Sequence, residues 1–216
     1  MMPEKPTVSR IRAALIVVAG FAGAGAIVGA LWAWLAPPIH QVVALTRSGD
    51  RIKAYLGTES DHWFTAAFLI IGMLAALAVV FAVLVWQWRV HRGPVMMAAL
   101  ALGGAAAGAA AAAAGALAVH LRYGTIDIAA APVTEENRVH YVVEAPAVFF
   151  GHSPWQIAAT VLFPAGVAAL VYLLAVTATA RDDLGAWPPV EYPALPTGRI
   201  GTAADVPPVA PTSPWH

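Results

Sequence analysis

The chain has 216 residues, no net formal charge, and a composition in which 60% of the residues are hydrophobic and 11% are charged. Soluble domains carry about 25% charged residues, so this composition is that of a membrane protein. The balanced charge gives no indication of a nucleic-acid partner. The lack of cysteine excludes disulfides, thiolate metal sites and cysteine nucleophiles.

Four segments without Asp, Glu, Lys, Arg or His are long enough to cross a bilayer, which needs about 20 apolar residues. They are residues 13–35, 63–88, 95–119 and 155–180. The first exceeds the apolar run of a secretory signal peptide, which is about 7–15 residues long, so we expect an uncleaved anchor. The expected fold is an all-α integral membrane protein with four transmembrane helices.

The distribution of positive charge predicts the orientation, because cytoplasmic loops are enriched in Lys and Arg. Basic residues lie at the N-terminus, in the short loop after the second span and after the fourth span: Lys5, Arg10, Arg12, Arg89, Arg92 and Arg181. The long loops 36–62 and 120–154 contain charges of both signs. We therefore expect a multi-pass plasma-membrane protein with both termini in the cytoplasm and both long loops outside.

Small residues at a spacing of four occur in the first and third spans. Gly25 and Gly29 form one GxxxG pair, and Gly104 and Gly108 form another within the Ala/Gly-rich stretch 103–116. This spacing lets helix backbones approach closely in a membrane. We expect these glycines at helix contacts. The spacing leaves open whether the neighbouring helix belongs to this chain or to a partner.

Short β-strands are expected in both long loops. In the first loop, VVAL and RIKAYL flank the turn signal SGD, which predicts a hairpin. In the second loop, residues 139–145 alternate with period two and predict a strand. These strands could pair, so the two extracytoplasmic loops are expected to form a small β-containing cap.

Helix starts carry their own signals. Thr58 or Ser60 is expected to cap the second span. The residues SPWQ at 153–156 fit a capping box with proline at the first helical position, which places the start of the fourth span. Pro164 predicts a kink within that span, because proline removes a backbone hydrogen bond.

The predicted organisation has three parts. Residues 1–12 are a short polar tail, and residues 13–180 form the transmembrane domain. Residues 181–216 are rich in proline, which favours extended or disordered chain and a cytoplasmic tail.

Residues that could contact a ligand or partner lie in the outer loops: Asp50, Arg51, Tyr55, Glu59, Asp61, His62, His140 and Glu144. The sequence has no HExxH or GxSxG motif, and no ionisable residue lies in a span, where a transporter would carry one. We therefore expect no catalytic residue, metal site or cofactor. The alternative is an envelope enzyme or metal-dependent factor in which Glu59, Asp61, His62 and His140 converge.

Three stretches, ALTRSGDRIKAYLGTESDHWFTAA, RVHYVVEAPAVFFGHSP and TARDDLGAWPPVEYP, resemble a mycobacterial family of four-span membrane proteins classed as a domain of unknown function. The resemblance covers most of residues 10–192. It implies a non-enzymatic accessory subunit of the Mce1 lipid-import complex that influences uptake of fatty acids or sterols. The implied partners are membrane lipids and the permease and ATPase of that complex. A further possibility is a homo-oligomeric membrane scaffold that uses the GxxxG faces on itself.

Overall fold

The computed structural model describes residues 8–181 and 184–185. It contains four helices long and apolar enough to cross a membrane. They are α1 (Arg10–Leu35), α2 (His62–Gln87), α3 (Pro94–Tyr123) and α4 (Pro154–Thr177). The four expected spans are confirmed as helices of this kind, whereas the predictions for residues 1–7 and 186–216 lie outside the described residues.

Three helix ends differ from the sequence prediction by three or more residues. α1 begins at Arg10 rather than at residue 13. α3 continues past Val119 to Tyr123 and ends at Gly124, whose φ of 69° does not continue a helix. α4 ends at Thr177 rather than at residue 180. At that end the hydroxyl of Thr179 donates to the carbonyl of Ala175, so side chains satisfy carbonyls of the last turn.

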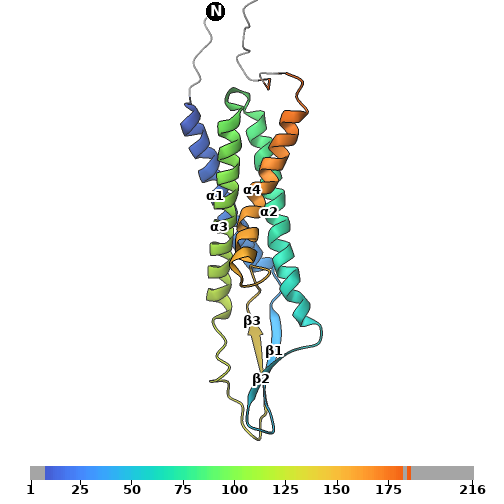
Figure 1. Cartoon of the computed structure of the whole chain (residues 1–216). Helices are drawn as coiled ribbons and strands as arrows, with labels where there is room; N and C mark the ends of the chain where they lie inside the picture. Colours follow the sequence, from blue (N-terminus) through green and yellow to red (C-terminus); the bar gives the residue numbers. More distant parts are fainter. Residues whose placement is uncertain (1–7, 182–183, 186–216) are drawn as a thin grey trace, which may run out of the picture.

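The helices form an elongated bundle with a loop end and a sheet end (Figure 1). At the loop end the short 3-10 helix η2 (Arg89–His91) connects α2 to α3. The Nε2 atom of the buried His91 ring lies 3.0 Å from the carbonyl oxygen of Val8. The guanidinium of Arg92 donates to the carbonyl of Leu184 at 2.7 Å. These contacts hold both ends of the described chain at the loop end.

The sheet end carries three antiparallel strands in the order β2-β1-β3. They are β1 (Ile39–Leu45), β2 (Arg51–Tyr55) and β3 (Val139–Glu144). The expected hairpin and the expected pairing of the second loop with it are both present. The sheet projects beyond the helices along the bundle axis (Figure 1).

The Ala/Gly-rich helix α3 is the centre of the bundle. In α3, 50% of the most apolar segment is buried, against 22–28% in the other helices. On one side it packs against α1, where a Cβ on Gly25 would lie 2.6 Å from the Cα of Ala107 and a Cβ on Gly29 would lie 2.8 Å from the Cα of Ala111. Real Cβ atoms do not approach backbone so closely, so glycine permits this contact.

The other side of α3 packs against α4. A Cβ on Gly104 would lie 2.6 Å from the Cα of Ala165, and one on Gly108 would lie 3.0 Å from the Cα of Val161. Both GxxxG pairs therefore make helix contacts inside this chain. A partner protein would have to contact other surfaces of the bundle.

Aromatic side chains fill the bundle at both ends. Near the loop end Phe21 stacks on Phe81 with ring centroids 4.4 Å apart. Near the sheet end Trp32 is fully buried, and its indole N–H donates to the carbonyl of Ala66 at 2.7 Å. A buried indole needs such an acceptor, so Trp32 fixes α1 against α2.

The capping box at the start of α4 is confirmed: Ser153 and Gln156 each bond the other's backbone N–H. The caps expected for α2 are wrong. A 3-10 turn, η1 (Glu59–Asp61), precedes α2, and neither Thr58 nor Asp61 makes a side-chain cap bond there. This turn moves the start of the α-helix past the predicted cap residues.

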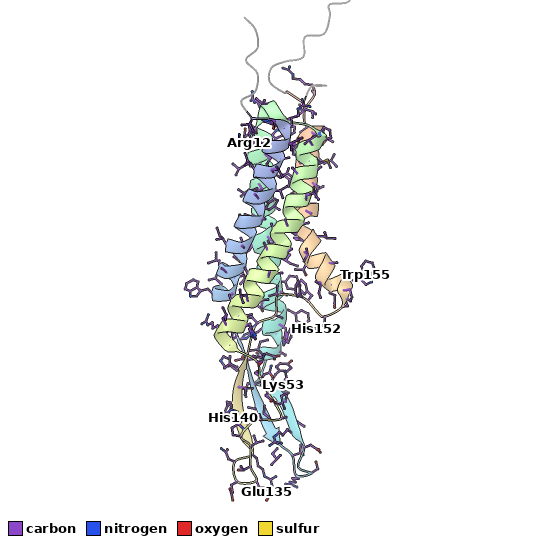
Figure 2. The ribbon with its side chains drawn as sticks, turned by 90° about the vertical axis from the view of Figure 1, so that its left-hand side faces the viewer. Arg12, Lys53, Glu135, His140, His152 and Trp155 are labelled. Carbon is purple, nitrogen blue, oxygen red and sulfur yellow. The ribbon has the colours of Figure 1, made fainter. Side chains whose placement is uncertain are left out.

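α4 remains one continuous helix through Pro164. Near the sheet end α4 leans away from the other helices, and Trp155 points outward (Figure 2). The side chain of Trp155 is 85% exposed. Near the sheet end, α4 is therefore the helix that separates most from the bundle.

Candidate functional site

The sheet has two unlike faces. Side chains alternate along a strand, and directly opposed residues in neighbouring strands share a face. On one face Ile39, Gln41 and Val43 are each 0% exposed. The segment 124–133 lies beside this face and lines hollows with Lys53 and Glu144 among others. We call this the covered face.

The opposite face is apolar and exposed. It is formed by Val42, Ala44, Ile52, Ala54, Val139, Tyr141 and Val143. Tyr141 is 69% exposed, Ile52 is 49% exposed and Val139 is 42% exposed. His40, opposite Val143, is the polar residue at its edge. We call this surface the apolar face.

An ordinary half-solvated sheet turns its polar residues outward, whereas here the outward face is apolar and the covered face holds both apolar and polar side chains. Strands lie about 4.8 Å apart and rise about 3.3 Å per residue, so the apolar face measures on the order of 300 Å² with its side chains. The largest apolar patch on a typical monomer measures about 300–600 Å² and is often functional. The apolar face is therefore the candidate functional surface.

A polar network on the covered face joins one residue from each strand. The carboxylate of Glu144 on β3 accepts from the side-chain amide of Gln41 on β1. It also accepts from the ammonium of Lys53 on β2, at 3.2 and 3.3 Å. Because the network satisfies polar groups beneath the sheet, the apolar residues of β2 and β3 are held on the outer face.

Replacing Glu144 with alanine is expected to loosen β3. The change leaves the fully buried amide of Gln41 without this acceptor, which costs about 1–3 kcal/mol. Amide hydrogen exchange in β3 should accelerate about tenfold or more. In the control Lys53→Met, which removes only a partly exposed ion pair, exchange should accelerate less than about fivefold. Equal acceleration in both variants would contradict the role assigned to Glu144.

A second polar group braces the sheet against the start of α2. The carboxylate of Glu59 accepts from the backbone N–H of His40 at 2.6 Å and lies 2.8 Å from the Nδ1 of the same residue. The Nδ1 of His62 lies 2.8 Å from the carbonyl oxygen of Pro38 and 3.6 Å from Glu59. Because a carbonyl only accepts, the proton of this bond belongs to His62. Glu59, His40 and His62 therefore tie β1 to α2.

The remaining predicted residues are dispersed. Asp50 lies in the hairpin turn and accepts from Ser48 at 2.8 Å. Arg51 and Tyr55 lie at the two ends of β2, and Asp61 precedes α2. None of these three contributes to the network around Glu144 or to the bonds of Glu59.

The alternative metal or catalytic cluster is not assembled. His140 pairs with Val43, three positions along β1 from His40, so it lies about 10 Å along the strand from the residue that Glu59 contacts. Among the described residues, no three His, Asp or Glu side chains are placed to hold a metal ion. The structure brings Glu59 and His62 together but not His140.

Sequence reasoning missed the apolar face. The signal is present in β3, where Val139, Tyr141 and Val143 alternate with residues that include His140 and Glu144. Period two separates these two sets but does not say which one is covered. The bonds of Glu144 to Gln41 and Lys53 determine which set lies on the covered face, and they join residues far apart in the sequence.

Comparisons with known proteins identify a family but no activity. A family model described as "Protein of unknown function (DUF2567)" matches residues 21–186. The chain is 50% identical over 195 residues to the uncharacterized protein Rv1591 of Mycobacterium tuberculosis, covering 90% of this chain and 99% of that protein. It is 53% identical over 169 residues to the uncharacterized protein ML1222 of Mycobacterium leprae, covering 78% and 85%. No solved structure matches.

Proposed function

This chain belongs to the DUF2567 family of proteins of unknown function, and we propose that it is a non-enzymatic accessory subunit of an Mce-type complex. Such a complex imports lipids through the cell envelope. The observation that carries the proposal is the exposed apolar face of the sheet. We further propose that the chain is related to LucB, an accessory factor associated with the Mce1 complex, and this relation directs the proposal to a lipid importer. In this role the chain binds and stabilises the importer and performs no chemistry itself.

The proposed occupant of the apolar face is the extracytoplasmic surface of a membrane subunit of the importer. The described ends of this chain lie at the loop end, separated from the sheet by the 30 residues of α3, a length of about 45 Å. Lipid is a poor occupant, because the sheet projects beyond the helices along the bundle axis (Figure 1). A second protein is the occupant that fits this position.

The size of the apolar face supports a partner that is itself a membrane protein. A stable interface buries about 800 Å² on each partner, more than this face supplies. The remaining area would come from the exposed apolar side chains of the helices, such as Ile27 and Leu31 on α1, which are 71% and 45% exposed. A partner that contacts both sheet and helices must cross the membrane beside this chain.

The proposal places the sheet outside the plasma membrane and both termini in the cytoplasm. At the loop end Arg10 and Arg12 begin α1, and Arg89 and Arg92 lie between α2 and α3. Within ten positions of these arginines in the sequence, Glu4 is the one acidic residue. The sheet end mixes both signs, from Lys53 to Glu135 at its tip (Figure 2). Positive charge concentrated at the loop end supports a cytoplasmic position for it.

Because the chain has no cysteine, single cysteines can test this orientation. A cysteine at Ser48, in the hairpin turn, should react with a membrane-impermeant maleimide in intact cells. A cysteine at Gln87, at the loop end of α2, should react only after the cells are permeabilised. The reverse pattern would place the sheet in the cytoplasm and remove the proposed docking site from the cell exterior.

Affinity purification in mild detergent, followed by mass spectrometry, tests the proposed function directly. We expect the permease and ATPase of an Mce-type complex to copurify with the full chain. Recovery of the chain alone, or of a homo-oligomer only, would contradict the proposal. Self-association through the GxxxG pairs is not expected, because those glycines already contact neighbouring helices within the chain.

A further inference from the structure

Two adjoining cavities lie where the helices meet the sheet. Their volumes are about 350 and 280 Å³, and both are lined by Trp63, Phe149, Gly151 and His152. Volumes of about 300–1,000 Å³ are typical of small-molecule sites. We call the two together the aromatic cavity. It is separate from the apolar face and from the polar networks of the sheet.

The polar groups of the aromatic cavity favour a ligand that accepts hydrogen bonds. Its polar side chains are Tyr55, Ser60, Trp63, His120 and His152, and none of the described lining residues is acidic. The indole N–H of Trp63 is buried and has no hydrogen-bond partner among the described residues. An indole can only donate, and buried donors in native proteins are normally bonded. That nitrogen is closed to solvent in the ligand-free structure, so a ligand oxygen reaches it once the ring of Trp63 turns toward the cavity.

The surroundings of the cavity favour an apolar chain. Phe64 and Phe68 on α2 are 60% and 64% exposed on the surface of the bundle. The ring of Phe68 packs edge-on against Phe150, with centroids 4.8 Å apart. These aromatic side chains extend from the cavity along α2, so they offer a path for an acyl chain toward the membrane.

The level of the cavity along the bundle also fits an amphiphile. His152 lies close to where the helices give way to the sheet, and Trp155 projects from α4 beside the helices, nearer the loop end (Figure 2). Exposed tryptophan is typical of the boundary between acyl chains and headgroups. A ligand bound here would place its polar end at the boundary and its apolar part beside the helices.

We propose that the aromatic cavity binds a single acyl chain whose polar end is a carboxylate or ester. An oxygen of that group accepts from the indole N–H of Trp63, with His152 as a second polar contact. The acyl chain follows Phe64, Phe68 and Phe150. This inference goes beyond the proposed function, because it concerns a ligand held by this chain without any partner protein.

The test uses the purified full chain in nanodiscs of ether-linked phosphatidylcholine, which carries no acyl carbonyl, and a palmitate probe with a diazirine near the end of its chain. We expect saturable labelling on peptides that contain Phe64 and Phe68 or Phe150. Trp63→Phe, which keeps an aromatic ring but removes the donor, should weaken probe binding about tenfold. The matched control Trp34→Phe changes a 73% exposed side chain outside the cavity and should bind as the parent does.

A second pair of variants tests occupation of the cavity without changing Trp63. Ser60 is exposed at the first cavity, so Ser60→Phe should obstruct it and reduce labelling at least fivefold. Thr58→Phe, an exposed position outside the cavity, should have no effect. Thermal unfolding of each variant establishes that the fold is retained. Labelling that is unchanged in both Trp63→Phe and Ser60→Phe, or spread evenly around the bundle, would overturn the proposal.

The source of the acyl chain is resolved by two competitors, unlabelled palmitate and a short-chain phosphatidylcholine. If only palmitate reduces the labelling, the cavity binds a free fatty acid. If both competitors reduce the labelling, the acyl-carbonyl group of a lipid is sufficient for binding. Competition by neither would contradict a specific site. Because the assay contains no importer, its failure would leave the docking proposal standing, and failure of the copurification would not affect this assay.

Discussion

Replacing Gly29 with leucine is expected to be among the most destabilising single changes in the bundle. A Cβ at this position would lie 2.8 Å from the Cα of Ala111, so the side chain meets backbone that cannot rotate away. Overpacking of this kind costs about 1–3 kcal/mol and more where helices must separate. A loss of 3 kcal/mol lowers the unfolding midpoint of a chain of this size by about 6–12 °C. Thermal unfolding in mild detergent measures this shift of the midpoint.

Gly23 provides the matched control for this experiment. It lies in the same helix as Gly29, but a Cβ there would have no atom of the described residues within 4 Å. Gly23→Leu should therefore leave the unfolding midpoint within about 2 °C of the parent value. Equal losses in the two variants would mean that leucine harms α1 for a reason other than its contact with α3.

Replacing Tyr141 with glutamate is expected to abolish copurification of the importer while leaving the chain folded. Tyr141 is 69% exposed, midway along the edge strand β3 on the apolar face, so the isolated chain should tolerate the charge. In a complex the carboxylate would be buried without a partner. Aromatic interface residues of this kind contribute about 2 kcal/mol or more, so affinity should fall about thirtyfold or more. Quantitative mass spectrometry of the purified complex measures the loss.

Ile52→Glu, on the other edge strand, should have the same effect, because Ile52 belongs to the same apolar face. Arg47→Glu is the control, since Arg47 is exposed in the hairpin turn and lies outside that face. Its copurification should match that of the parent chain. If the Tyr141 and Ile52 variants retained the importer at parental levels, the apolar face would not be the docking surface.

Much of the architecture could be predicted from the sequence because its signals are local. Uncharged runs of sufficient length gave the four spans, and a turn signal between alternating segments gave the hairpin. The SPWQ capping box marked the start of α4 within one residue. Each of these signals depends on neighbouring residues, so the rest of the fold does not override it.

The contacts of the glycines could be predicted only in part. The GxxxG spacing indicates where backbones approach, but Gly25 contacts α3 whereas Gly104 contacts α4. The spacing carries no information about which helix is the neighbour. That choice depends on the joint packing of all four helices, in which α3 lies between α1 and α4.

The acidic and histidine residues illustrate the opposite case. Glu59, Asp61 and His62 are adjacent in sequence and invite the interpretation of a site, yet the closest bonds of Glu59 are to His40, nineteen positions earlier. The 3-10 turn directs neighbouring side chains to different sides. Trp63 went unnoticed as a site residue for a similar reason, because its cavity depends on the distant segment 145–152.

The most direct measurement of the central proposal is site-specific photocrosslinking from position 141 in living cells. A benzophenone amino acid in place of Tyr141 lies on the apolar face and reacts with whatever covers it. We expect a covalent adduct with a membrane subunit of an Mce-type importer, and no such adduct when the probe replaces Arg47. Absence of an adduct at position 141, or an adduct only with a second copy of this chain, would contradict it.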